Sequence, residues 1–233
     1  MSTTEEKLQH AQEWMRREVL AQKQQLWKTS RSEDDIIASL KNYFPQEVFL
    51  YFSDTDLKEL VSSELLFDLQ WQHPDIDGSA IVLGYQKVFD SLVEEYITKW
   101  FRKYIKKVSS LPSPENTPLE KSLYQVVKRG FRLSAWRIFE ILENTKNSKD
   151  TWYYESLFIS YLQSSKELEI SLLTSNFLIH LRVLAYKKIL WEKRHSWILS
   201  AEDTVLARKI YIWNLQDGDS LLNLLAQLCV VDG

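Results

Sequence analysis

The chain of 233 residues is 45% hydrophobic and 13% aromatic with a formal net charge of −3, which is enough apolar material for a packed core and excludes a disordered chain. Its single cysteine, Cys229, excludes an intramolecular disulfide and a zinc site of the CxxC type. The N-terminus lacks the pattern of a secretory signal and no apolar run approaches the roughly 20 residues that span a bilayer, so we expect a cytoplasmic protein without a membrane partner.

Helical patterns dominate the whole chain. It contains only five glycines and five prolines, and the last proline is Pro118. Few stretches alternate between apolar and polar residues as strands do, and no Asn-Gly or Asp-Gly pair joins two β-branched runs. The sequence therefore predicts an all-α fold, a multi-helix bundle.

The first predicted helix differs from those that follow it. A cap at Ser2 or Thr3 precedes a narrow apolar stripe flanked by Gln, Lys and Arg, which suits an arm that lies on a partner. The next predicted elements are a helix that begins at Ser32, a short aromatic segment from Pro45 to Phe52, and a helix that Thr55 caps.

A domain boundary is predicted at residues 73–79, where Pro, Gly and capping residues cluster. It divides the chain into an N-terminal helical arm or subdomain, residues 1–72, and a helical bundle, residues 74–233. The first unit is the candidate surface for a protein partner, because an amphipathic helix can dock in a groove.

The second unit begins with a long amphipathic helix at residues 79–107, whose last turns are rich in lysine and arginine. Cationic side chains stabilise the C-terminal end of a helix, and they can also bind an anionic partner. Further helices are predicted at residues 118–128, 134–143, 151–163, 171–193, 200–215 and 220–229, with a break at Gly130 and a polar turn at 144–150.

The charge of the chain is unevenly distributed. Residues 99–137 hold ten lysines and arginines against two acids, a net charge of +8 that leaves −11 for the remainder. Trp100 and Trp136 stand among these cations, and such a ring can stack on a base while its neighbours hold phosphates. The candidate nucleic-acid ligands are Lys99, Arg102, Lys103, Lys106, Lys107, Lys128, Arg129, Arg132 and Arg137, with Trp100 and Trp136. The alternative is that these residues form ordinary solvated helix faces.

Three stretches resemble HEPN-type helical bundles of bacterial proteins, over about residues 74–229. Residues 75–101 contain Gly-Tyr-Gln-Lys-Val-Phe at 84–89 and are similar to the first core helix of these bundles. Residues 132–139, Arg-Leu-Ser-Ala-Trp-Arg-Ile-Phe, resemble their short middle helix. Residues 193–225 resemble their closing pattern of a basic-histidine turn, a capped helix and a leucine-rich helix.

The resemblance implies a role in RNA biology, including CRISPR and toxin–antitoxin systems, and a homodimer. In catalytic members a basic residue and a histidine face each other across the dimer and cut RNA, so the implied candidates are His195 with Lys188 or Arg194. The family pattern is an arginine, then four to six residues, then a histidine. This pattern is not matched, because the basic residue at that distance before His195 is Lys188 and not an arginine. The alternative is that His195 merely ends a helix, where cationic side chains are favoured.

Three functions remain open on the sequence. The leading prediction is a non-catalytic protein that binds RNA or DNA or acts as a scaffold in a nucleoprotein or defence-type assembly, a CRISPR-associated one included. The alternatives are a metal-independent endoribonuclease that uses His195 and a protein–protein adaptor. No cofactor is expected, because P-loop, GxGxxG and GxSxG motifs are absent, and no metal is expected, because the histidines and acids lack ligand spacing.

Overall fold

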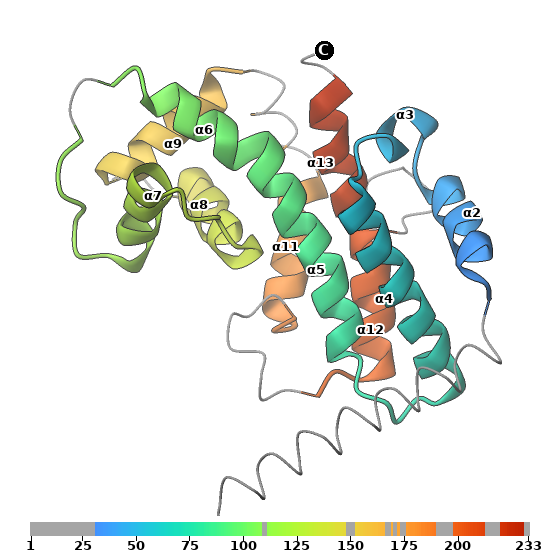
Figure 1. Ribbon diagram of the computed structural model, residues 1–233. Helices are drawn as coiled ribbons and strands as arrows, with labels where there is room; N and C mark the ends of the chain where they lie inside the picture. The colour runs from blue at the N-terminus through green and yellow to red at the C-terminus, as the bar shows by residue number, and fades with distance from the viewer. Residues whose placement is uncertain are drawn as a thin grey trace, which may run out of the picture.

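The computed structural model describes residues 31–108, 111–147, 152–165, 176–189, 198–212 and 220–230, together with 169 and 172. Every regular element within these ranges is a helix, which confirms the all-α multi-helix bundle (Figure 1). No helix of the described ranges is long and apolar enough to cross a membrane.

A long interrupted helix forms the centre of the molecule (Figure 1). Three segments follow one another without a break in helical conformation: α5 (Ser79–Val93), a π-helical turn η1 (Glu94–Thr98) and α6 (Lys99–Ile105). This confirms the long helix predicted at 79–107. One face is fully buried because apolar side chains recur along it, among them Tyr85, Phe89 and Phe101.

The N-terminal elements lie along one side of this axis as α2 (Glu33–Tyr43), α3 (Gln46–Phe49) and α4 (Asp54–Gln72). The Ser32 cap of α2 is confirmed. The cap of α4 is Ser53 and not Thr55, because the Ser53 hydroxyl accepts from the amide of Asp56 and the Asp56 carboxylate accepts from the amide of Ser53, at 3.2 and 3.1 Å.

Helices α4 and α5 approach each other closely at Gly84. A Cβ atom at this position would lie 1.9 Å from the Ser63 hydroxyl of α4 and 3.3 Å from the Ser63 Cβ, so any residue other than glycine would displace at least that hydroxyl. The helix pair thus joins the two predicted units over an extensive contact.

The remaining described helices complete the bundle (Figure 1). The Pro118 start is confirmed, the Ser200 cap is confirmed, and Gly130 ends a helix in the left-handed conformation with φ of 69°. The polar turn predicted at 144–150 is wrong over 144–147, which continue the preceding helix. The helices are α7 (Pro118–Arg129), α8 (Ala135–Asn147), α9 (Tyr153–Gln163), α11 (Asn176–Tyr186), α12 (Ala201–Tyr211) and α13 (Leu221–Val230).

The helix predicted at 171–193 is wrong at its C-terminal end. Helix α11 ends at Tyr186, and Lys188 adopts a left-handed φ of 58°. The turn returns Ile189 to the core, where it is fully buried and its amide donates to the carbonyl of Leu184 at 2.8 Å. Lys188 is exposed in this turn, so it does not lie on a helix face seven residues before His195. His195 and Arg194 lie outside the described residues.

The predicted boundary at residues 73–79 is a connection between tightly packed helices. Besides the α4–α5 contact, α3 packs against α13 and α4 against α12. The amide of Gly78 also donates to the carbonyl of Leu199 at 3.0 Å. Whether residues 1–72 and 74–233 fold separately stays a prediction, and residues 1–30 lie outside the described ranges.

Candidate nucleic-acid interface

The cations of α6 share one face of that helix. Lys99, Arg102, Lys103 and Lys106 follow the i, i+3, i+4, i+7 spacing of a single helical face, and the buried Phe101 falls between them on the other side. Lys107 is exposed just beyond the end of the helix. The local pattern therefore presents a strip of positive charge to solvent.

Acids from outside the counted segment neutralise part of this charge. Three of the predicted cations are ion-paired along their own helix: Lys99 with Glu95, Arg102 with Glu94, and Arg137 with Glu140. Helical neighbours three to eight residues away thus reduce the net charge that the sequence count of residues 99–137 predicts.

Arg102 has a structural role in addition to its charge. Its side chain is largely buried against Glu94, and one guanidinium nitrogen donates to the carbonyl of Gly130 at 3.4 Å. This bond joins the middle of α6 to the C-terminal end of α7, where Lys128 and Arg129 are exposed. The cations at the ends of α6 and α7 are thereby brought to neighbouring positions.

Glu120, one of the two acids within residues 99–137, does not face solvent. Glu120 is fully buried, and its carboxylate accepts from the amides of Tyr154 and Glu155 at 2.7 and 2.9 Å. Burial raises the pKa of Glu120 above its ordinary value, although these two donors oppose the shift. The carboxylate caps the start of α9 and does not offset the surface cations.

Exposed aromatic rings accompany the cations. Trp100 is 46% exposed, and the Lys103 ammonium lies 3.8 Å from the centroid of its ring. Phe131 is 50% exposed between Gly130 and Arg132. Phe131 was not predicted as a site residue, although its position between Arg129 and Arg132 in the sequence was a usable signal. Trp136 instead packs against Phe139 and the core, so less of its ring is accessible.

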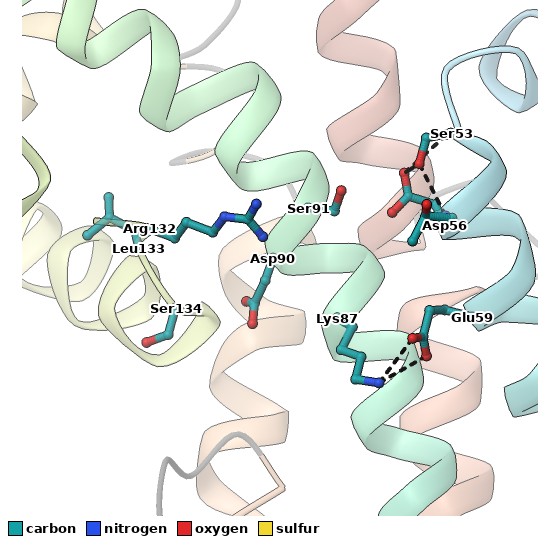
Figure 2. Close-up of a pocket in the computed structure, with 10 residues that line it drawn as sticks. Ser53, Asp56, Glu59, Lys87, Asp90, Ser91, Arg132, Leu133 and Ser134 are labelled. Carbon is teal, nitrogen blue, oxygen red and sulfur yellow. Dashed lines mark hydrogen bonds and ion pairs between the residues drawn. The ribbon is translucent and has the colours of Figure 1, made fainter. Parts of the chain in front are cut away.

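Arg132 lies apart from the α6 face and lines a groove of about 570 Å³ (Figure 2). The groove lies between the N-terminal turns of α4, the outer face of α5 and the link at residues 131–134. Its lining residues are Ser53, Thr55, Asp56, Glu59, Lys87, Asp90, Ser91, Arg132, Leu133 and Ser134. Among them only Arg132 was a predicted site residue, because the groove forms from segments about 80 residues apart in the sequence.

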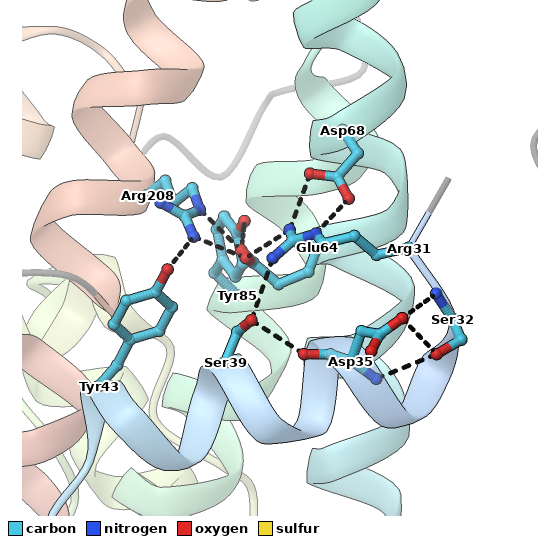
Figure 3. Close-up of polar contacts among 9 residues, drawn as sticks. All are labelled: Arg31, Ser32, Asp35, Ser39, Tyr43, Glu64, Asp68, Tyr85 and Arg208. Atoms are coloured by element: carbon cyan, nitrogen blue, oxygen red, sulfur yellow. Dashed lines mark hydrogen bonds and ion pairs between the residues drawn. The ribbon is translucent and has the colours of Figure 1, made fainter. Parts of the chain in front are cut away.

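A polar network around the buried Glu64 and Arg208 joins α2, α4, α5 and α12 (Figure 3). The Arg208 guanidinium donates to both oxygens of Glu64 at 2.8 and 2.7 Å, and the Tyr85 hydroxyl donates to Glu64 at 2.7 Å. Arg31 extends the network by a two-pronged contact with Asp68 at 2.8 Å. Burial raises the pKa of Tyr85 well above its ordinary value, and the Glu64 charge adds to the shift.

This network is structural in character. Burial alone would lower the pKa of Arg208, but the hydrogen bonds that its guanidinium donates to Glu64 hold that pKa above the ordinary value, so Arg208 stays charged. The Arg208 guanidinium also lies 4.7 Å from the ring centroid of Phe67. All atoms of the Glu64 carboxylate are occupied by Arg208 and Tyr85, which leaves it unavailable to a substrate.

Comparisons with known proteins do not assign this chain to a family. No family model matches the chain, and neither curated proteins nor solved structures give a match. The HEPN resemblance therefore stays a prediction. Across the part of the chain that the structure describes, no group of three or more His, Cys, Asp or Glu side chains is placed to hold a metal ion.

Proposed function

We propose that this chain is a non-catalytic helical protein that binds single-stranded nucleic acid through its basic face. We define the basic face as the exposed residues of α6, the end of α7 and the link that follows: Lys99, Trp100, Lys103, Lys106, Lys107, Lys128, Arg129 and Phe131. The observation that carries the proposal is the pair of half-exposed rings, Trp100 and Phe131, among these cations.

Physical chemistry favours a single strand over a duplex for such a surface. Cations attract phosphates of any sequence, and a flat exposed ring offers a stacking partner of about 1–3 kcal/mol to an unpaired base. Lysine dominates the face, and lysine contacts phosphate as a point charge without the two-pronged readout of arginine. Binding should therefore depend strongly on salt and weakly on base sequence.

RNA is the nucleic acid that the HEPN resemblance favours, and a nucleoprotein or defence-type assembly is the setting that it implies. Arg102 and Arg137 already bond within the protein, so they position helices more than they offer free charge. The variants that test the proposal should leave these two arginines intact.

The test is fluorescence anisotropy of the full chain with labelled single-stranded RNA and DNA across a salt series. Each phosphate contact contributes a slope of about 0.7 in log affinity against log salt. The variant K103A/K106A/K107A should weaken binding to every sequence and flatten the slope by about 2. The matched control K58A/K187A/K209A removes three exposed lysines elsewhere and should retain the slope.

Two results would contradict the proposal. One is the absence of salt-sensitive binding to either nucleic acid near physiological ionic strength. The other is an equal loss of affinity in the two triple variants, since binding would then depend on the total charge of the protein and not on the basic face. Replacement of Trp100 by Leu tests the ring separately and should weaken binding about five-fold or more at constant salt slope.

A further inference from the structure

The groove beside α5 has the volume of a small-ligand site. Its volume of about 570 Å³ falls within the range of about 300–1,000 Å³ that is usual for such sites. Lys87, Asp90 and Ser91 of α5 form its floor, with the start of α4 on one side and the 131–134 link on the other (Figure 2).

The carboxylates of the groove are already engaged by the fold. Glu59 holds the Lys87 ammonium at 3.0 Å, and Asp90 accepts from the Ala135 amide at the start of α8 at 2.9 Å. Asp56 accepts from Ser53 in the capping box of α4. Each carboxylate is therefore already hydrogen-bonded within the fold, and Glu59 is also ion-paired.

Arg132 is the cation of the groove that the fold does not neutralise. Its guanidinium reaches from the link to α5, where Asp90 and Ser91 also line the groove, and no ion pair of Arg132 is found within the described residues (Figure 2). A guanidinium presents a planar fork of donors that matches a phosphate or carboxylate, and a hydroxyl adds one more donor. This end of the groove is thus suited to an anionic group.

The rest of the lining selects hydroxyl groups over apolar ones. Leu133 is the apolar side chain of the lining, whereas the Glu59 carboxylate of α4 can accept from ligand hydroxyls besides holding Lys87. A ligand that carries one anionic group and several hydroxyls satisfies both parts of the surface.

We propose that the groove binds a sugar phosphate, with Arg132 and Ser91 on the phosphate and the Glu59 carboxylate of α4 on the sugar hydroxyls. The chemistry is the same for a free sugar phosphate and for the phosphorylated 5′ end of a strand, which could reach Arg132 from the adjacent Phe131. The inference does not depend on nucleic-acid binding by the basic face.

Isothermal titration of the full chain with ribose 5-phosphate tests the proposal. We expect saturable binding at least about ten-fold tighter than that of ribose or inorganic phosphate. Arg132→Gln should weaken it about ten-fold or more, and Ser91→Ala about two- to ten-fold, as is typical for the loss of a charged and a neutral hydrogen bond. The matched control Arg129→Gln removes an exposed arginine outside the groove and should bind as the wild type does.

Three outcomes would overturn the proposal: no saturable binding, equal affinity for inorganic phosphate and ribose 5-phosphate, or unchanged affinity in Arg132→Gln. Circular dichroism of each variant separates a lost site from a lost fold. The basic-face variant K103A/K106A/K107A should bind ribose 5-phosphate normally, so failure of the groove and failure of the basic face are distinguishable.

A pair of trinucleotides, with and without a 5′ phosphate, identifies the source of the ligand. Preference for the phosphorylated strand that disappears in Arg132→Gln would assign the groove to strand ends. Binding of ribose 5-phosphate without such a preference would assign it to a free sugar phosphate.

Discussion

At the scale of single residues, the buried Glu64–Arg208 pair is a contact between distant helices that the sequence did not reveal. Both side chains are almost inaccessible, at 1% and 7% exposure, and they join helices 144 residues apart. Glu64 stands in the apolar stripe of α4, four residues after Leu60 and three after Val61, so its burial follows from the helical spacing, but its partner does not. A long-range ion pair of this kind is invisible to periodicity.

Removal of one partner of this pair should destabilise the protein severely. Glu64→Ala and Arg208→Ala each leave an uncompensated buried charge, and we expect each to lower the free energy of unfolding by about 3–5 kcal/mol. Urea denaturation followed by circular dichroism measures the change. The control pair is Glu59 with Lys87 at the surface, where Lys87→Ala should cost at most about 1 kcal/mol. Comparable losses at both pairs would refute the role given to Glu64.

Tyr154 should make stability depend on alkaline pH. Burial raises the pKa of Tyr154 to about 12, with smaller contributions from Tyr124 and Tyr153. Because the unfolded chain releases this proton at about pH 10, the stabilisation is complete below that pH and is lost as pH rises from about 10 to about 12. Tyr154→Phe should flatten this part of the stability profile, as denaturation at a series of pH values would show. An unchanged slope would mean that the hydroxyl titrates normally.

At the scale of helices, local signals were sufficient where a few neighbouring residues determine the structure. Ser32, Ser200 and Pro118 begin helices as predicted, because caps act within one turn. The correct cap of α4 was also available in the sequence, since Ser53 and Asp56 have the spacing of a capping box. The end of α11 could not be predicted from local sequence, because it depends on the burial of Ile189 in the core.

Gly130 illustrates a local requirement that the sequence did reveal. Its φ of 69° is strained for any residue with a side chain, although a Cβ there would meet no atom within 4 Å. Gly130→Ala should therefore lower the free energy of unfolding by about 1–2 kcal/mol through backbone strain alone. Gly130→Asn should cost less, because asparagine tolerates this conformation. Thermal denaturation of the two variants measures the difference, and equal losses would point to a cause other than φ.

Like the helix ends, the candidate sites could be predicted only where residues close in sequence determine them. The cations of α6 were recognisable because they share a helical face, but their pairing with Glu94 and Glu95 was missed because the charge count began at residue 99. The groove could not be predicted, since its walls come from α4, α5 and the 131–134 link. Local sequence thus reveals the residue types of a surface, whereas tertiary packing decides which of them remain available.

At the scale of the whole molecule, the contacts across residues 73–79 bear on the predicted division into two units. Helix α4 supplies Glu64 to Arg208 and packs along α5, with Gly84 at their closest approach. A fragment of residues 74–233 would expose the α4-facing side of α5 and leave Arg208 without its carboxylate. Burial of unpaired charge and exposure of apolar surface both oppose folding.

We therefore expect residues 74–233 alone to be poorly soluble or to unfold without a cooperative transition in circular dichroism. Residues 1–72 supplied as a separate chain should restore a soluble, cooperatively folding complex, because α4 then returns both its apolar face and Glu64. The same complex made with Glu64→Ala should form poorly, which tests the ion pair across the divided chain. A soluble fragment 74–233 with a cooperative thermal transition would instead establish the boundary at 73–79 as a true domain limit, and the Glu64–Arg208 pair would then be dispensable to the bundle.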